Sequence, residues 1–297
     1  AALFELNVEP ALAVAQWGSP ALQSELFTAL ANGGIATTVR DSTGTLQVHS
    51  DASGNGIRIS GRIGPAPGLA TASHVLLLAE CEGAPIVAVL ELAASQARVE
   101  AITPSGWRYA SWGVATLEHA HINADHVLGR GPLGQFAIDW ILAWHRTSLA
   151  ARAAGVAAAA MEHAERYGNE RFQFGQPVGN FESIIRLRED SQTAAASARL
   201  NALYAGWACD QLGAKPSVTA VHNAWDAASR ARIIACDAVS KATIDAVQIF
   251  GGYGFVADYP VEKLMRDARA FEALLGDERL ERTLRARNLV NTALVHT

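Results

Sequence analysis

The chain reads DAVQIFGGYGF over residues 245–255, where a long helical pattern runs into a cluster of glycines. From Ser217 to Phe250, apolar residues recur at i, i+3 and i+4 spacing, which predicts a helix, and glycines just past its end are typical of a C-terminal cap. Similar patterns cover residues 136–167, 181–212 and 278–296. Each of the first three patterns is long enough for a helix of about 45 Å. Glycine and proline breaks separate these patterns, so we predict a four-helix bundle.

Residues 35–130 have a pattern that is typical of β-structure instead. Thr45–His49 and Ile57–Ser60 alternate apolar and polar residues, and Asn55-Gly56 between them is a tight-turn signal. Further β-rich stretches lie at 74–79, 86–92, 98–102 and 114–122. Residues 1–34 have helical spacing that stops at Gly33-Gly34. The predicted fold class is therefore α+β, with N-terminal helices (1–34), an antiparallel β-domain (35–130) and a helical bundle (131–297).

The composition excludes several classes of protein. Of the 297 residues, 50% are hydrophobic and 18% are charged, which is typical of a globular chain rather than a disordered one. The net charge of −5 offers no basic excess for a nucleic-acid backbone, and the apolar runs are too short and too interrupted to span a membrane. The three cysteines have no CxxC spacing, so we expect no disulfide framework and a cytoplasmic location.

Common catalytic motifs are missing from the sequence. It contains no HExxH, GxSxG or GxxxxGK[ST] pattern, and no βαβ alternation that would support a GxGxxG dinucleotide-binding fingerprint, which argues against metalloproteases, serine hydrolases, kinases and classical nicotinamide enzymes. His119 and His121 lie two apart on a predicted strand and so share one face, but no carboxylate accompanies them there. We interpret them as surface histidines and predict no metal site.

Two segments contain residues suited to ligand binding, but their spacing alone does not distinguish a binding site from an ordinary helix end. Glycines after Gln248 would let a phosphate or a ring approach the backbone closely, but such glycines are more often simple helix caps. Arg171, in the first interhelix turn, is suited to a bidentate phosphate contact or to plain solvent exposure.

Together these two segments resemble signatures of the acyl-CoA dehydrogenase family. Residues 245–269 match the C-terminal signature almost residue for residue, and Glu170–Val178, followed by Phe181, matches the second signature. Arg146, Gly18 and the stretch 124–129 also fit the family pattern. The resemblance covers essentially the whole chain. It is strong over 165–270 and weak in the predicted β-domain.

The resemblance implies the same α–β–α order of domains, bound FAD and oxidation of an acyl-CoA at its α,β bond. In such enzymes a glutamate removes the α-proton while the flavin accepts the β-hydride. FAD is shared between subunits there, with the ADP half held by the neighbour's bundle. Carried over by position, the residues that would hold it are Arg171, Gln173, Phe174, Gln248, Gly251 and Gly252.

This chain departs from the family pattern where the chemistry would occur. Leu275 stands at the usual position of the catalytic glutamate, and His145 stands at the alternative position on the first bundle helix. Gly64-Pro-Ala-Pro-Gly replaces the aromatic and hydroxyl residues expected beside the flavin ring, and most of the N-terminal helical domain is expected to be absent. We therefore assign no catalytic residue to this chain.

The combination is similar to the base-less short subunits of α2β2 acyl-CoA dehydrogenases of steroid side-chain degradation. It implies a full-length partner subunit that carries the glutamate, binds most of the acyl-CoA and shares its FAD with this chain. Two alternatives stay open. One is a homomeric flavoenzyme that uses His145 as its base, since imidazole titrates near neutral pH. The other is a scaffold protein that has lost FAD.

Overall fold

The computed structural model describes residues 2–41, 44–51, 54–274, 282–283 and 285–286. The chain divides into two compact units, residues 1–142 and 143–297. The first unit holds the N-terminal helices and eight strands, and the second is helical apart from one small hairpin. The long helix α3 (Pro132–Glu170) begins in the first unit and continues into the second.

The strands of the first unit form two four-stranded sheets. One has the order β1-β4-β5-β8 and the other has the order β2-β3-β7-β6. The bounds are β1 (Ala36–Arg40), β2 (Gln47–Ser50), β3 (Gly56–Ala66), β4 (His74–Cys81), β5 (Ala84–Glu91), β6 (Arg98–Ala101), β7 (Gly113–Asn123) and β8 (Val127–Arg130). The predicted hairpin is confirmed as the antiparallel pair β2–β3.

The antiparallel prediction is wrong at one place, because β1 pairs with β4 in parallel. These strands are far apart in the sequence, so no turn signal reveals their pairing. Leu77, Ile59 and Leu117 come from three different strands and pack in one buried core between the sheets. Burial of this apolar surface is the main free-energy term that holds the unit together.

Two helices precede the first strand, α1 (Ala2–Trp17) and α2 (Pro20–Ala31). The Ser19 hydroxyl caps α2 by accepting a bond from the amide of Leu22 (3.2 Å). Asn7 holds α1 to the sheet, because its Oδ1 accepts a hydrogen bond from the Ala36 amide (2.8 Å). Glu25 of α2 contacts His74 of β4 at 3.2 Å. Both helices are thus anchored to the first sheet by polar contacts.

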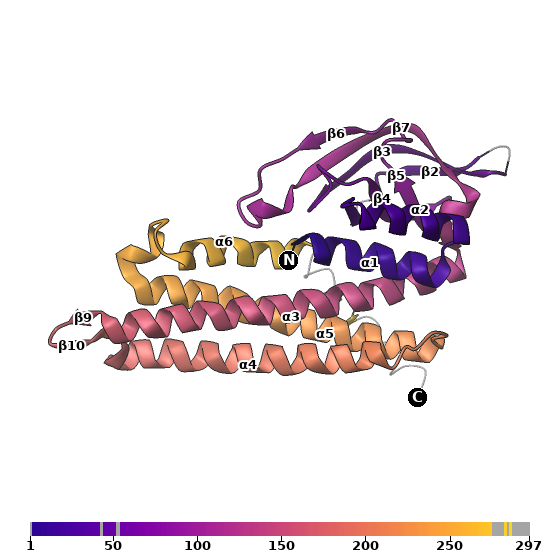
Figure 1. Cartoon of the computed structure of the whole chain (residues 1–297). Helices are drawn as coiled ribbons and strands as arrows, with labels where there is room; N and C mark the ends of the chain where they lie inside the picture. The colour runs from indigo at the N-terminus through magenta and orange to yellow at the C-terminus, as the bar shows by residue number, and fades with distance from the viewer. Residues whose placement is uncertain (1, 42–43, 52–53, 275–281, 284, 287–297) are drawn as a thin grey trace. The chain divides into compact units, whose positions relative to one another are not determined.

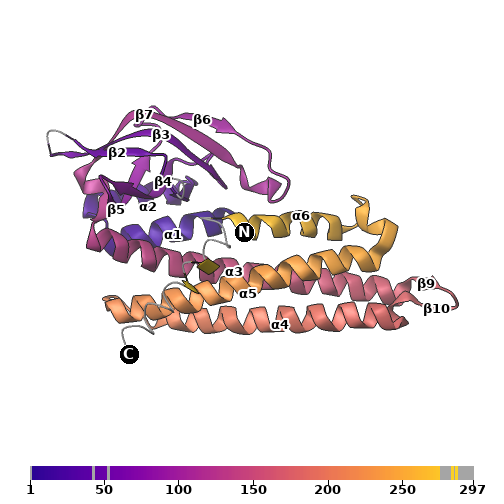
Figure 2. The same cartoon turned by 180° about the vertical axis from the view of Figure 1, so that it is seen from behind.

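The second unit contains the C-terminal part of α3 together with α4 (Glu182–Asp210), α5 (Val218–Phe250) and α6 (Pro260–Ala273). Figures 1 and 2, from opposite sides, both show α3, α4 and α5 side by side, with α6 along α5. Three of the four predicted helices are confirmed to within four residues at each end. The predicted helix 278–296 lies almost wholly outside the described residues.

Alanines on α4 and α5 let the two helices pack closely. On α4 the buried face is made of Ala195, Ala198, Ala202, Ala205 and Ala208, and α5 presents a similar row. A polar link crosses this apolar interface, where the Ser191 hydroxyl donates to the Asp245 carboxylate (2.6 Å). Lys241 donates to the same carboxylate (2.7 Å), so this buried charge is paired.

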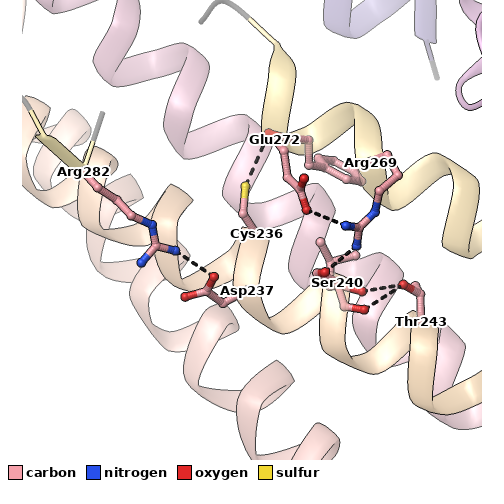
Figure 3. A network of polar contacts seen from close by, with 9 residues as sticks. Cys236, Asp237, Ser240, Thr243, Arg269, Glu272 and Arg282 are labelled. Atoms are coloured by element: carbon pink, nitrogen blue, oxygen red, sulfur yellow. Dashed lines mark hydrogen bonds and ion pairs between the residues drawn. The ribbon is translucent and has the colours of Figure 1, made fainter. Parts of the chain in front are cut away.

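The helix α6 was not predicted, although Tyr259-Pro260 is a start signal that was available, with proline at the first helical turn. Arg232 of α5 is 2% exposed and donates to the carbonyls of Phe271 (3.5 Å), Glu272 (3.2 Å) and Leu274 (2.9 Å). These carbonyls lack intrahelical partners at the end of α6. Figure 3 shows neighbouring contacts, including Arg269 with Ser240 and Glu272.

We expect Arg232→Met to lower the free energy of unfolding by about 3 kcal/mol, because it leaves buried carbonyls at the end of α6 without donors. Arg230→Met is the matched control, since Arg230 is half-exposed and pairs with Asp226 one turn away (2.7 Å). Loss of that surface pair should cost no more than about 1 kcal/mol. Urea unfolding followed by circular dichroism measures both values. Equal losses in the two variants would contradict the capping role.

Candidate functional site

The structure brings the two sequence signatures together at one end of the second unit. Tyr167, near the end of α3, stacks on Phe250 at the end of α5, with ring centroids 4.1 Å apart. Tyr253 lies in the 3-10 turn η4 (Gly251–Phe255), and Tyr259 is the N-cap residue of α6. Their rings lie 6.4 Å and 6.2 Å from that of Tyr167. This aromatic cluster of Tyr167, Phe250, Tyr253 and Tyr259 fixes the Arg171 segment beside the glycine-rich segment.

Sequence reasoning did not single out the aromatic cluster. The sequence signal for this cluster is the placement of Tyr253 within the glycine-rich segment and of Tyr259 shortly after it. Burial raises the pKa of the Tyr167 hydroxyl above its usual value, with smaller electrostatic effects from Arg171, which lowers it, and from the other two tyrosines, which raise it. The Tyr167 hydroxyl is therefore uncharged at neutral pH, and the stacked rings provide a partly apolar base for the exposed groups around them.

Arg171 follows α3 directly and leads into a small hairpin formed by β9 (Phe172–Gln173) and β10 (Gln176–Pro177). The hairpin is closed by a bond from the Val178 amide to the Arg171 carbonyl (2.7 Å). The Arg171 side chain is exposed, and its guanidinium lies over the Tyr253 ring, 5.7 Å from the centroid. A cation–π contact of this kind orients the guanidinium while leaving its N–H groups available.

The turn of this hairpin holds an exposed phenylalanine in a disfavoured backbone conformation. Phe174 and Gly175 form the two-residue loop, with φ values of 51° and 81°. Positive φ at both positions is typical of a type I′ turn, which favours Asn-Gly and is strained with phenylalanine. Phe174 is also 92% exposed, and its ring lies edge-on to the ring of Phe181, with centroids 6.3 Å apart. Neither local geometry nor apolar burial in the described part of the chain accounts for this residue.

Two of the three glycines of η4, Gly251 and Gly252, are open to solvent. A Cβ atom added at Gly251 or Gly252 would meet nothing within 4 Å, whereas one at Gly254 would lie 2.6 Å from the Val247 carbonyl oxygen. Gly251 needs its positive φ of 57°, but Gly252 has neither a positive φ nor a crowding neighbour. Gln248 is exposed one turn earlier on α5. The backbone at Gly252 is thus accessible to a group from outside the chain.

Of the two positions where the family pattern would place a catalytic base, one lies elsewhere on α3 and the other lies outside the described residues. His145 is buried on α3, 6% exposed, next to Arg146, whose guanidinium lies 4.8 Å from the Trp225 ring centroid. The 26 positions between His145 and Arg171 correspond to about 39 Å along the helix, more than the length of one dinucleotide. His145 and the Arg171 hairpin of one copy therefore belong to different sites. Leu275 lies outside the described residues.

The chemistry of this end of the bundle suits a dinucleotide rather than a metal. Among the described residues, no group of three histidine, cysteine or acidic side chains is placed to hold a metal ion. In the same part of the chain, no helix is both long and apolar enough to cross a membrane. A guanidinium, two carboxamides and an open glycine backbone are instead donors for phosphates and for a heterocyclic base. The six sequence-predicted binding residues lie on the hairpin, on η4 and on the last turn of α5.

Comparison with known proteins identifies the family. A family model for the acyl-CoA dehydrogenase C-terminal domain matches residues 134–290, more than half of the chain. The chain belongs to the acyl-CoA dehydrogenase family. An acyl-CoA dehydrogenase of Bacillus subtilis strain 168 is 38% identical over 145 residues, which cover 49% of this chain and 36% of that protein. The chain also spans less than half the length of other curated relatives that it matches.

Solved structures show the same fold. An acyl-CoA dehydrogenase from Bacillus anthracis, complexed with FAD, has a TM-score of 0.84 and 20% identity, and the match covers 96% of this chain and 52% of that one. The ChsE4-ChsE5 complex from Mycobacterium tuberculosis has a TM-score of 0.77 and 23% identity, with 95% and 74% covered. The predicted fold class of this chain is therefore confirmed.

We predict that Phe174→Asn raises the free energy of unfolding by about 1 kcal/mol, because Asn-Gly is a preferred pair for a turn with two positive φ values. Phe172→Asn is the control, since Phe172 is 60% exposed in the adjacent strand and has no such conformational strain. Thermal and urea unfolding measure both variants. A destabilised Phe174→Asn protein would show that the phenylalanine ring contributes to folding rather than to a site.

Proposed function

We propose that this chain is the non-catalytic subunit of a heteromeric, FAD-dependent acyl-CoA dehydrogenase. Its hairpin and η4 would hold the ADP half of an FAD whose flavin ring lies in a partner subunit. That partner would carry the catalytic glutamate and bind most of the acyl-CoA. The resemblance described above favours a steroid side-chain CoA thioester as the substrate and an α2β2 assembly.

One observation carries this proposal. Three unusual residues lie close together: Arg171 is exposed, Phe174 is strained and 92% exposed, and Gly252 has open space above its backbone. No packing inside the described part of the chain explains the exposed phenylalanine at 174 or the glycine at 252. Strained backbone and exposed aromatic rings are typical of ligand clamps and interfaces. A pyrophosphate would satisfy the Arg171 guanidinium, and an aromatic base or ring would cover Phe174.

The roles of the individual residues follow from their chemistry. Arg171 and Gln173 would donate to the pyrophosphate region, and Tyr253 would orient the guanidinium from below. Gln248 would hydrogen-bond through its carboxamide, while Gly251 and Gly252 would allow close approach to the backbone. When bound, FAD supplies the hydride acceptor for α,β-oxidation of the thioester. This chain would bind and orient, and proton abstraction would belong to the partner.

The absence of a glutamate at the two family positions supports the division of labour. Leucine at 275 has no group that accepts a proton, and His145 lies far along α3 from the hairpin. A partner is further supported by the fold likeness to a protein that is itself a complex of two named components. The leucine at 275 and this fold likeness favour a partner that carries the base over a homomeric enzyme, and the exposed donors of the hairpin and η4 favour a bound cofactor over a scaffold without FAD.

Flavin content and molecular mass test this proposal directly. The chain is purified alone and together with a candidate full-length subunit, and FAD absorbance and light scattering are measured for each sample. We expect little flavin on the lone chain and one FAD per pair of different subunits. One FAD per chain in a homo-oligomer would refute the proposal and direct attention to His145.

We predict that Gly252→Ala weakens FAD binding to the complex at least tenfold while leaving the unfolding free energy of the chain within about 1 kcal/mol. The added methyl group meets nothing inside the chain, so only an external group can exclude it. Gly155→Ala on α3 is the matched control, because its Cβ atom is equally open. Fluorescence titration with FAD measures the affinity. Unchanged FAD affinity in Gly252→Ala would contradict a role for this glycine.

A further inference from the structure

The first unit contains a cleft of about 640 Å³ between α2 and one end of the first sheet. Its polar lining consists of Ser24, Glu25, Thr28 and Asn32 on α2, His74 at the start of β4 and Glu91 at the end of β5. Two alanines of α2 complete the wall. A volume of this size is typical of small-molecule sites. We call it the α2 cleft, and it shares no residue with the candidate FAD site.

The α2 cleft exists because α2 has two different faces. Leu22 and Leu26 are fully buried and hold the helix in place. Ser24, Thr28 and Asn32 follow one another every four residues, so they lie on one face, which lines the cleft. Their side chains are short and make no hydrogen bond with the described part of the chain. Their oxygen atoms are therefore available to a group that enters the cleft.

One carboxylate of the α2 cleft is fixed in position by histidines. The His74 side chain is 5% exposed; its Nδ1 lies 2.9 Å from the Ser73 hydroxyl and its Nε2 lies 3.2 Å from the Glu25 carboxylate. His126 contacts the other oxygen of Glu25 at 3.5 Å. A carboxylate has about four acceptor positions, so Glu25 keeps some of them for a ligand.

The second carboxylate has no counter-charge. Glu91 lies opposite His74 in the β4–β5 ladder and is half-buried, but its side chain makes no ion pair or hydrogen bond with any described residue. The described residues that line the α2 cleft include no lysine or arginine. A carboxylate that is partly removed from water is stabilised by a cation. As reported above, the described residues offer no metal site, so the expected cation carries its charge on N–H groups.

We propose that the α2 cleft binds a small alkyl diamine. Each primary ammonium has three N–H donors, and the two groups would pair with Glu91 and Glu25, which come from different elements. Ser24, Thr28 and Asn32 would accept remaining N–H bonds, and the methylene chain would lie on the alanines. The two carboxylates repel phosphates, so neither FAD nor an acyl-CoA suits this cleft. The proposal is therefore independent of the proposed function.

Calorimetric titration of the purified chain, with any partner that purifies with it, tests the ligand class. We expect saturable binding of the four-carbon diamine putrescine, with one site per copy of this chain. Butanediol has the same length without charge, and tetramethylammonium has charge without N–H groups, so each should bind at least tenfold more weakly. Absence of saturable putrescine binding, or equal binding of either control compound, would overturn the proposal.

Removal of one charge tests the site. Glu91→Gln should weaken putrescine binding at least tenfold, because the amide keeps the shape of the side chain but not its charge. Glu80→Gln is the matched control, since Glu80 is an exposed carboxylate near the other end of β4. It should leave the affinity unchanged. An equal loss in both variants would assign the binding to the net negative charge of the chain and overturn the proposal.

A steric variant tests the same site without changing any charge. Ser24→Trp, at an exposed position of α2, places a large ring in the α2 cleft and should abolish putrescine binding. Ala31→Trp, exposed at the end of α2 and outside the cleft, is its control and should bind normally. Circular dichroism verifies that both variants are folded. A folded Ser24→Trp chain with unchanged affinity would overturn the proposal even if Glu91→Gln fails to fold.

Discussion

The stack of Tyr167 on Phe250 is the interaction on which the candidate site depends. It joins the end of α3 to the end of α5, and so brings a hairpin after one helix beside a glycine turn after another. Tyr253 and Tyr259 extend the contact, with ring centroids 5.7 Å apart, and Tyr253 also supports the Arg171 guanidinium. Without this cluster, the exposed donors would belong to two independent loops. The position of the site is therefore set by packing, and its chemistry by residues that the packing leaves exposed.

The two ends of α3 differ in a way that matches the proposed division of labour. Near the hairpin, polar groups are exposed and available to a partner or a cofactor. Near His145 and Arg146, the side chains are buried, and Arg146 packs on Trp225. A dinucleotide held at the first end cannot reach the second within one copy. In our proposal the chain therefore contributes binding energy at its exposed end, while proton transfer occurs in the partner.

Much of the fold could be predicted from the sequence, for identifiable reasons. Helices of about thirty residues repeat the 3.6-residue period many times, so the bounds of α3, α4 and α5 were predicted closely. The hairpin β2–β3 is local and has a turn signal. The parallel pairing of β1 with β4 depends on contacts distant in sequence, and α6 is short enough to be missed. At the site, the sequence identified Arg171 and Gln248 by resemblance, but strain at Phe174 and the open space above Gly252 required backbone geometry.

The central claim is that Arg171 and Gln248 grip an FAD that belongs to a complex with another subunit. The most direct measurement is the FAD content of the complex when this chain carries Arg171→Met and Gln248→Ala together. Arg166→Met, one turn earlier on α3 and also exposed, serves as the control. We expect the double variant to assemble with its partner but to lose FAD and dehydrogenase activity, while the control retains both. A double variant that keeps its partner, its flavin and its activity would contradict the account.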